Sequence, residues 1–177
     1  MFAFLQSRPR LDKFHQVLAQ RGGRWYRACL RVTGDAGLAE DAVQEALLKA
    51  WDKRGTFRGE AELDTWIHRI ALNAAIDLLR KRRGPIDAAD DLDRHAAPPE
   101  ATPHAQYEER ALGGDIEASL QRLTPREREA FVLKHFEGWT LEEIAAKQGG
   151  NVNNTKQALF RAVKKLRADL HAWRGEA

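Results

Sequence analysis

The sequence of 177 residues contains a single cysteine, Cys29. One cysteine cannot build a disulfide framework within the chain or a cysteine-based zinc site. The six histidines are scattered, without the spacing of metal ligands. Because no nucleophile, base or metal ligands converge in the sequence, we expect no metal, no cofactor and no catalytic centre, and hence a protein that is not an enzyme.

Long hydrophobic runs are also absent. No apolar stretch approaches the length that spans a membrane, and the apolar run in the N-terminal MFAFLQSRPR is too short for a signal peptide. Mean hydropathy is −0.58, yet 43% of the residues are hydrophobic. We therefore expect a cytoplasmic protein without membrane insertion that can still bury helical cores.

Charge is distributed unevenly along the chain. Residues 1–83 hold 16 basic and 10 acidic residues, a net charge of +6, whereas residues 84–107 hold 1 basic and 5 acidic residues, a net charge of −4. Residues 108–177 are nearly balanced, with 12 basic and 11 acidic residues. Two basic ends around an acidic middle favour an extended polyanion as partner over an acidic small molecule.

The acidic middle predicts the domain organisation. Residues 84–106 break all periodicity and hold four of the six prolines. Such composition is typical of a mobile linker. On both sides the apolar residues recur at helical spacing, which predicts an all-α protein. We expect two small helical domains, residues 1–83 and 108–177, joined by a flexible acidic linker at residues 84–107.

The C-terminal part has the pattern of a helix-turn-helix. Thr140 and Glu143 form a capping box that begins one helix, Gly149 and Gly150 end it, and Asn151 or Asn153 can cap the next. From residue 147 to 174 there are seven Lys or Arg and one acid. A basic second helix of this kind enters the DNA major groove, although an ordinary helical hairpin with a solvated charged face stays open as an alternative.

Upstream of that motif, two further helices are predicted in the C-terminal part. One begins near Pro103 and continues through Leu120. The other begins with a second capping box, Thr124 to Glu127, has proline at its first position, and stops at Gly138.

The N-terminal part predicts three helical segments. Residues 11–31 show amphipathic faces interrupted by Gly22-Gly23. Residues 38–51 carry a buried apolar stripe, and their other side holds Asp41, Gln44, Glu45 and Leu48. That acidic side is a candidate protein-docking surface, but the residues alone favour a merely solvated face.

A long helix is predicted over residues 63–83, and a glycine-bounded loop precedes it. Arg69, Asn73, Asp77 and Arg80 fall on one side of this helix, and a basic run at residues 80–83 closes it. Cations at a helix C-terminus are stabilising in any case, so this run also has a structural explanation. Phe57, in the loop, is harder to explain by packing, and such aromatic side chains can stack on unpaired bases.

Taken in order, these segments resemble a bacterial sigma factor of the extracytoplasmic-function (ECF) group of the sigma-70 family. DAGLAEDAVQEALLKAW (residues 35–51) resembles the segment that docks on RNA polymerase. FRGEAELDTWIHRIALNAAIDLLRKRR (residues 57–83) resembles the segment that melts and reads the minus-ten element. LTPREREAFVLKHFEGWTLEEIA (residues 123–145), with the following turn and helix, resembles the module that reads the minus-thirty-five element.

The resemblance implies a role for each candidate residue. Polymerase binding falls to Asp41, Gln44, Glu45 and Leu48. The minus-ten site comprises Phe57, Trp66 and Asn73, which hold an unstacked base, and Arg58, Arg69, Arg80, Lys81 and Arg82, which hold phosphates. The minus-thirty-five site comprises Lys156, Gln157 and Arg161 in the major groove, Lys134 and Lys165 on the backbone, and Thr155 and Phe160.

The partners that the resemblance implies are core RNA polymerase, through the clamp helices of its largest subunit and its flap, promoter DNA and an anti-sigma factor. Two other function classes remain to be weighed. A stand-alone helix-turn-helix transcriptional regulator would explain residues 108–177 but leaves the acidic face and Phe57 without a task. A carboxylate-dependent nuclease would need Asp41 and Glu45 to hold a metal, and their spacing suits a helix-surface contact better.

Overall fold

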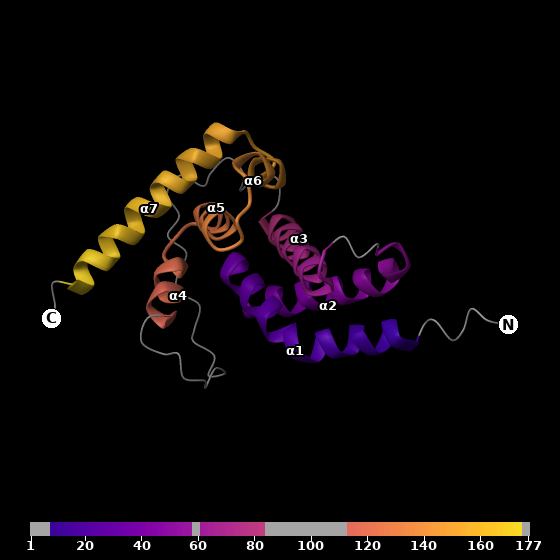
Figure 1. The fold of residues 1–177 in the computed structure, drawn as a ribbon. Helices are drawn as coiled ribbons and strands as arrows, with labels where there is room; N and C mark the ends of the chain where they lie inside the picture. The colour runs from indigo at the N-terminus through magenta and orange to yellow at the C-terminus, as the bar shows by residue number, and fades with distance from the viewer. Residues whose placement is uncertain (1–7, 58–60, 84–112, 175–177) are drawn as a thin grey trace.

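A computed structural model describes residues 8–57, 61–83 and 113–174 of the chain (Figure 1). Every regular element in these ranges is helical. The elements are α1 (Arg8–Thr33), α2 (Ala36–Asp52), the short 3₁₀ helix η1 (Lys53–Thr56), α3 (Leu63–Arg83), α4 (Gly113–Gln121), α5 (Pro125–His135), α6 (Leu141–Gln148) and α7 (Val152–Arg174). No helix in these ranges is both long and apolar enough to cross a membrane.

Helices α1, α2 and α3, the first module, pack against one another. Four alanines of α2 are buried without exposed surface: Ala39, Ala42, Ala46 and Ala50. Small side chains let the three helix backbones approach closely, and the larger Trp25 and Ile67 fill the remaining space. The predicted apolar stripe of α2 is therefore its buried side, and α3 has the bounds that the sequence predicts.

Helix α1 differs from its prediction at Gly22-Gly23, where the structure continues as one uninterrupted helix. Each glycine inside a helix costs about 1 kcal/mol relative to alanine. The burial of Trp25 and Cys29 immediately after this pair offsets that cost by fixing the second half of the helix against α2 and α3. The helix ends at Gly34, which has a φ of 66° and so adopts the left-handed conformation that favours glycine.

Helices α4 to α7 form the second module, in which α5 and α6 begin at their predicted caps. Both capping boxes are present, Thr124 with Glu127 and Thr140 with Glu143. Gly149 closes α6 at φ 64°, and the side chain of Asn151 accepts the backbone N–H of Asn154 (2.9 Å) to begin α7. The predicted start of α4 near Pro103, and the predicted linker at residues 84–107, lie outside the described residues.

The two modules share one hydrophobic core. Helix α5 packs on α1 on one side and on α7 on the other (Figure 1). Leu72 and Ile76 of α3, with Val32 of α1, belong to the same buried cluster as Leu133 of α5 and Ile144 of α6. The described helices thus form one packed body, in which the second module covers a side of α3 that the first module leaves open.

Candidate polymerase and DNA interfaces

The predicted polymerase face lies on α2, opposite the buried alanines. Asp41, Gln44 and Leu48 are exposed, and Leu48 keeps 69% of its surface accessible. Glu45 is half-buried and pairs with Lys49 (2.5 Å). An exposed leucine on such a helix face can bury apolar surface against a partner protein. The carboxylates beside it favour a partner whose surface is basic.

Two of the three residues predicted to hold an unstacked base lie close together, Phe57 just before α3 and Trp66 in its first turn. The rings of Phe57 and Trp66 lie 5.1 Å apart between centroids, tilted by 41°, and both side chains are half-buried. The indole N–H of Trp25 and the guanidinium of Arg24 donate to Asp64 nearby (both 2.8 Å), which anchors this end of α3 on α1. Arg58 lies outside the described residues.

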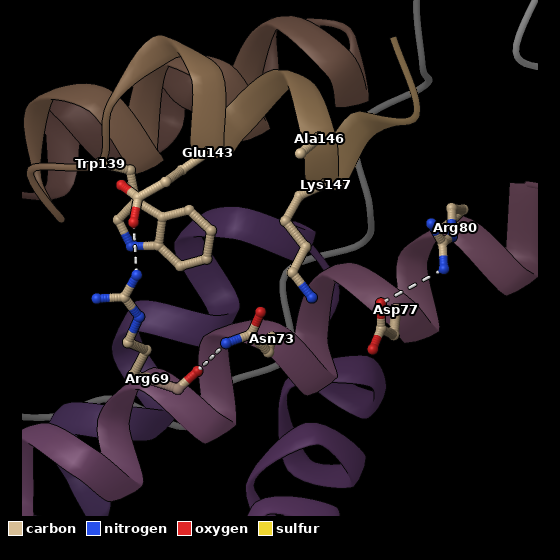
Figure 2. A pocket seen from close by; sticks show the side chains of 8 residues that line it. All are labelled: Arg69, Asn73, Asp77, Arg80, Trp139, Glu143, Ala146 and Lys147. Atoms are coloured by element: carbon tan, nitrogen blue, oxygen red, sulfur yellow. Dashed lines mark hydrogen bonds and ion pairs between the residues drawn. The ribbon is translucent and has the colours of Figure 1, made fainter.

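Further along α3, a groove of about 450 Å³ lies between the modules (Figure 2). Its α3 wall consists of Arg69, Asn73, Asp77 and Arg80, and its other wall consists of Trp139, Glu143, Ala146 and Lys147. The sequence predicted the α3 wall as one face of the helix, and the structure brings those four residues together. The sequence did not predict that α6 would lie across the groove from these α3 residues.

Several polar side chains of the groove bind other groups of the protein. Arg69 pairs with Glu143 (2.5 Å) and lies over the ring of Trp139, 5.5 Å from its centroid. Asn73 donates to the carbonyl of Arg69 (2.7 Å), one helical turn earlier. Arg80 pairs with Asp77 (3.6 Å). Arg69 thus contacts the second module, whereas the contacts of Asn73 and Arg80 lie within α3, and the Arg69 and Arg80 side chains stay about three-fifths exposed.

Two carboxylates that bind these arginines stay ionised well below neutral pH. The backbone N–H of Thr140 and then the Arg69 guanidinium lower the pKa of Glu143. Asp35 caps α2 by accepting the backbone N–H of Leu38, and this hydrogen bond, followed by that from Arg82, lowers its pKa. Arg69 and Arg82 must leave fixed negative charges before they can hold phosphates. Lys81 is exposed.

On α7, two of the three predicted major-groove residues, Lys156 and Gln157, lie on the open side of the helix, and Phe160 lies there with them. Lys156, Gln157 and Phe160 are exposed, Phe160 by 72%. Thr155 is fully buried, so the prediction that it contacts DNA is wrong. Its hydroxyl lies 3.5 Å from the side-chain oxygen of Gln148 and 3.4 Å from the carbonyl of Asn151, where it ties α6 to α7.

Two other predicted DNA contacts have a partner within the protein. Arg161 donates through Nε (3.2 Å) and Lys165 through Nζ (2.8 Å) to the carboxylate of Glu127, which is only 2% exposed. Both cations remain about two-fifths exposed. Lys134 is exposed, and its amine lies 3.4 Å from the carbonyl of Trp139.

Residues that sequence reasoning missed lie where the modules meet. Arg128 donates from Nη2 to the carbonyl of Thr33 (2.7 Å), and His68 contacts Glu137 (2.6 Å). No local pattern reveals such pairs, because the partners are 95 and 69 residues apart. Within the described ranges, no three His, Cys, Asp or Glu side chains gather as metal ligands would.

Comparison with known proteins identifies the two modules. The family model for sigma-70 region 2 matches residues 18–84, and that for sigma-70 region 4 matches residues 114–166. The chain is 33% identical over 156 residues to the RNA polymerase sigma factor CarQ of Myxococcus xanthus, covering 88% of each chain. It is 32% identical over 164 residues to the ECF sigma factor SigE of Mycolicibacterium smegmatis, covering 89% of this chain and 61% of that relative.

A solved structure has the same fold. It is the sigma factor RpoE of Bartonella quintana, determined with the anti-sigma factor NepR, and it superposes with a TM-score of 0.55 over 90% of this chain and 97% of that one at 24% identity. Two region matches in the expected order, with relatives that align along most of the chain, leave one conclusion: the chain belongs to the sigma-70 family of RNA polymerase sigma factors, in the ECF group.

Proposed function

We propose that this sigma factor is a non-catalytic specificity subunit with its tasks divided between three helices. Helix α2 docks the protein on core RNA polymerase, α3 melts and reads the minus-ten element, and α7 reads the minus-thirty-five element. The observation that carries the proposal is the exposed face of α2, where Leu48 stands among Asp41, Gln44 and Glu45. A regulator that only bound duplex DNA would have no use for such a face.

The DNA contacts follow from side-chain chemistry. Phe57 and Trp66 offer aromatic surface on which an unstacked base can rest, and the Asn73 amide can hydrogen-bond its edge. Removing a base from the stack costs a few kcal/mol, which these contacts offset. On α7, Lys156 and Gln157 have the donors that read base edges in the major groove.

Control by an anti-sigma factor is a further part of the proposal. The RpoE structure contains one, NepR. The exposed apolar groups of this chain, Leu48 on α2 and Phe160 on α7, give such a protein surfaces that polymerase and DNA also need. Competition for those surfaces would keep the factor inactive.

The test is promoter-directed transcription with core RNA polymerase on a genomic fragment library, with Asp41→Ala/Glu45→Ala beside the wild type. We expect discrete start sites with the wild type and loss of core binding with the double variant. Removing two charges from an interface of this kind typically weakens binding by about tenfold or more.

A matched control, Glu62→Ala/Glu142→Ala, changes two other exposed acids. Glu62 lies just before α3, and Glu142 lies on α6. This variant should bind core polymerase as the wild type does. If the wild type itself never associates with core polymerase but binds promoter duplex alone, the docking role of α2 is wrong and a plain helix-turn-helix regulator remains.

A further inference from the structure

Helix α5 holds a buried carboxylate against α7, the helix proposed to read the minus-thirty-five element. Glu127 is 2% exposed, and its oxygens accept from Nε of Arg161 (3.2 Å) and from Nζ of Lys165 (2.8 Å). Both cations keep about two-fifths of their side-chain surface accessible, so each extends from the buried carboxylate to the surface of the protein. Arg161 follows the proposed base-reading residue Gln157 by four residues, which places the two on one side of α7.

The capping box of α5 does not require the negative charge of Glu127. Glutamine serves as well as glutamate at this position of the box, because a side-chain oxygen accepts the backbone N–H of the cap residue, here Thr124 (3.1 Å). A carboxylate has about four acceptor positions, and the cap uses one of them. A buried charge is unfavourable unless it is paired, and Arg161 and Lys165 supply the pairs. The charge thus serves the two cations of α7 and not the cap.

Binding to the carboxylate restricts how Arg161 can meet a base. An unbound arginine side chain has many rotamers and can present any edge of its guanidinium. With Nε bound to Glu127, the plane of the group is fixed and the two Nη groups remain for a ligand. Two parallel N–H donors match the O6 and N7 acceptors that guanine presents in the major groove. A side chain that is already held in place also loses less conformational entropy on binding.

The same carboxylate reduces the attraction of α7 to DNA of any sequence. Lys165 is a point charge, which can bind phosphate but reads no base sequence there. Glu127 cancels one of the two positive charges that it binds, so the three groups together carry a net charge of +1. Because phosphate contacts supply essentially all of the non-specific affinity for DNA, this cancellation weakens non-specific binding. The guanine contact of Arg161 is not weakened with it, since Nη1 and Nη2 keep their donors.

We propose that Glu127 is a positioning residue for the minus-thirty-five element. It holds Arg161 so that the two Nη groups read a guanine, and it withholds Lys165 from the phosphates. The inference rests on the proposed function, because it requires α7 to lie in the major groove. It adds a specificity determinant that is buried in the protein, and it names the base that Arg161 recognises.

The test uses holoenzyme made from core RNA polymerase and the full chain. The start sites found with the genomic fragment library define a promoter, and each base pair of its minus-thirty-five element is then changed in turn. Competition binding with these duplexes gives the discrimination of the holoenzyme at each position, and a salt titration gives the slope of affinity against salt. Glu127→Gln is compared with the wild type, since it keeps an oxygen for the cap and removes the charge. The matched control is Glu117→Gln, which removes a carboxylate paired with Arg31 of α1 instead.

We expect Glu127→Gln to lose about tenfold in discrimination at one guanine and to keep its discrimination at the other positions. Its salt slope should become steeper by about one, because Lys165 is free to bind a phosphate. The control should match the wild type in both measurements. A loss of stability alone would weaken binding to every duplex alike and would not steepen the salt slope.

A double-mutant cycle shows whether Glu127 acts through Arg161. Arg161→Ala should lose the preference for that guanine, and Glu127→Gln added to Arg161→Ala should reduce the preference no further. The proposal is overturned if Glu127→Gln keeps the wild-type preference, or if it lowers the preference equally with and without Arg161.

The failure of this inference differs from the failure of the proposed function. If the holoenzyme selects discrete start sites but the wild type and Glu127→Gln discriminate alike at every position, only the positioning role of Glu127 is wrong. If the wild type selects no start sites with core polymerase, the proposed function and the positioning role are both wrong.

Discussion

Glu127 shows how one side chain can serve two elements. It is the third helical residue of the α5 capping box, and its carboxylate accepts the backbone N–H of Thr124 (3.1 Å). The same carboxylate binds Arg161 and Lys165 of α7. Because the carboxylate is buried and the two cations are held to it, Glu127 fixes the direction in which α7 presents its basic side.

We predict that Glu127→Gln lowers the free energy of unfolding by about 1.5–3 kcal/mol, the range for hydrogen bonds to charged groups. The amide keeps an oxygen for the Thr124 N–H but brings no charge for Arg161 and Lys165. Urea denaturation followed by circular dichroism measures the loss. Glu142→Gln, on the exposed side of α6, should change stability by less than about 0.5 kcal/mol, and equal losses in both variants would contradict the assigned role.

At the residue scale, the sequence predicts caps well and long-range partners poorly. The boxes at Thr124 and Thr140 are readable because all their atoms lie within four residues. The partner of Arg161 is 34 residues away, so no local pattern predicts that Glu127 binds it. The resemblance implies a DNA contact for Thr155, yet the helix buries its side chain.

Among the elements, α7 depends most on how it begins. The Gly149 turn reverses the chain, and Asn151, rather than Asn153, supplies the cap. A capped first turn holds the exposed residues that follow, Lys156 and Gln157, in helical order at the point where they would enter a groove.

We predict that Asn151→Ala destabilises the protein by about 1 kcal/mol, because the backbone N–H of Asn154 loses its acceptor. The neighbouring Asn153→Ala is the control and should lie within about 0.5 kcal/mol of the wild type. Thermal unfolding of the two variants side by side measures the difference. A larger loss of stability for Asn153→Ala than for Asn151→Ala would contradict the assignment of the cap to Asn151.

Element boundaries were predictable wherever a local signal decides them, as at Gly138 and Gly149. The continuity of α1 through Gly22 and Gly23 was not, because the packing of Trp25 that overrides the glycines is a tertiary contact. A usable signal was overlooked in α3. Leu72 and Ile76 lie on a different side of α3 from Ile67, and a helix with apolar residues on two sides is covered on both.

For the whole molecule, the shared core predicts coupled unfolding. Ile76 of α3 packs in the cluster that includes Leu133 of α5, whereas Ile67 packs only within the first module. We predict that Ile76→Ala lowers hydrogen-exchange protection in both α3 and α5, with a loss of about 2–5 kcal/mol.

The matched variant Ile67→Ala removes a similar volume from the buried cluster formed by α1, α2 and α3. It should reduce protection in α1 to α3 more than in α5 to α7. Exchange followed by mass spectrometry resolves the helices. If Ile76→Ala leaves α5 unaffected, the modules unfold independently and the shared core contributes nothing to their coupling.

The carbonyl groups at the end of α1 have a consequence for the newly made chain. Translation delivers residues 8–83 before Arg128 exists, at about 5–20 residues per second. For roughly 2–9 seconds at that rate, the carbonyl groups of Val32 and Thr33 lack the Arg128 donor. During the same interval Leu72 and Ile76 are not covered by the second module. Each ribosome making this protein thus passes through an interval in which the apolar side of α3 is available to chaperones, and to neighbouring chains on the same messenger.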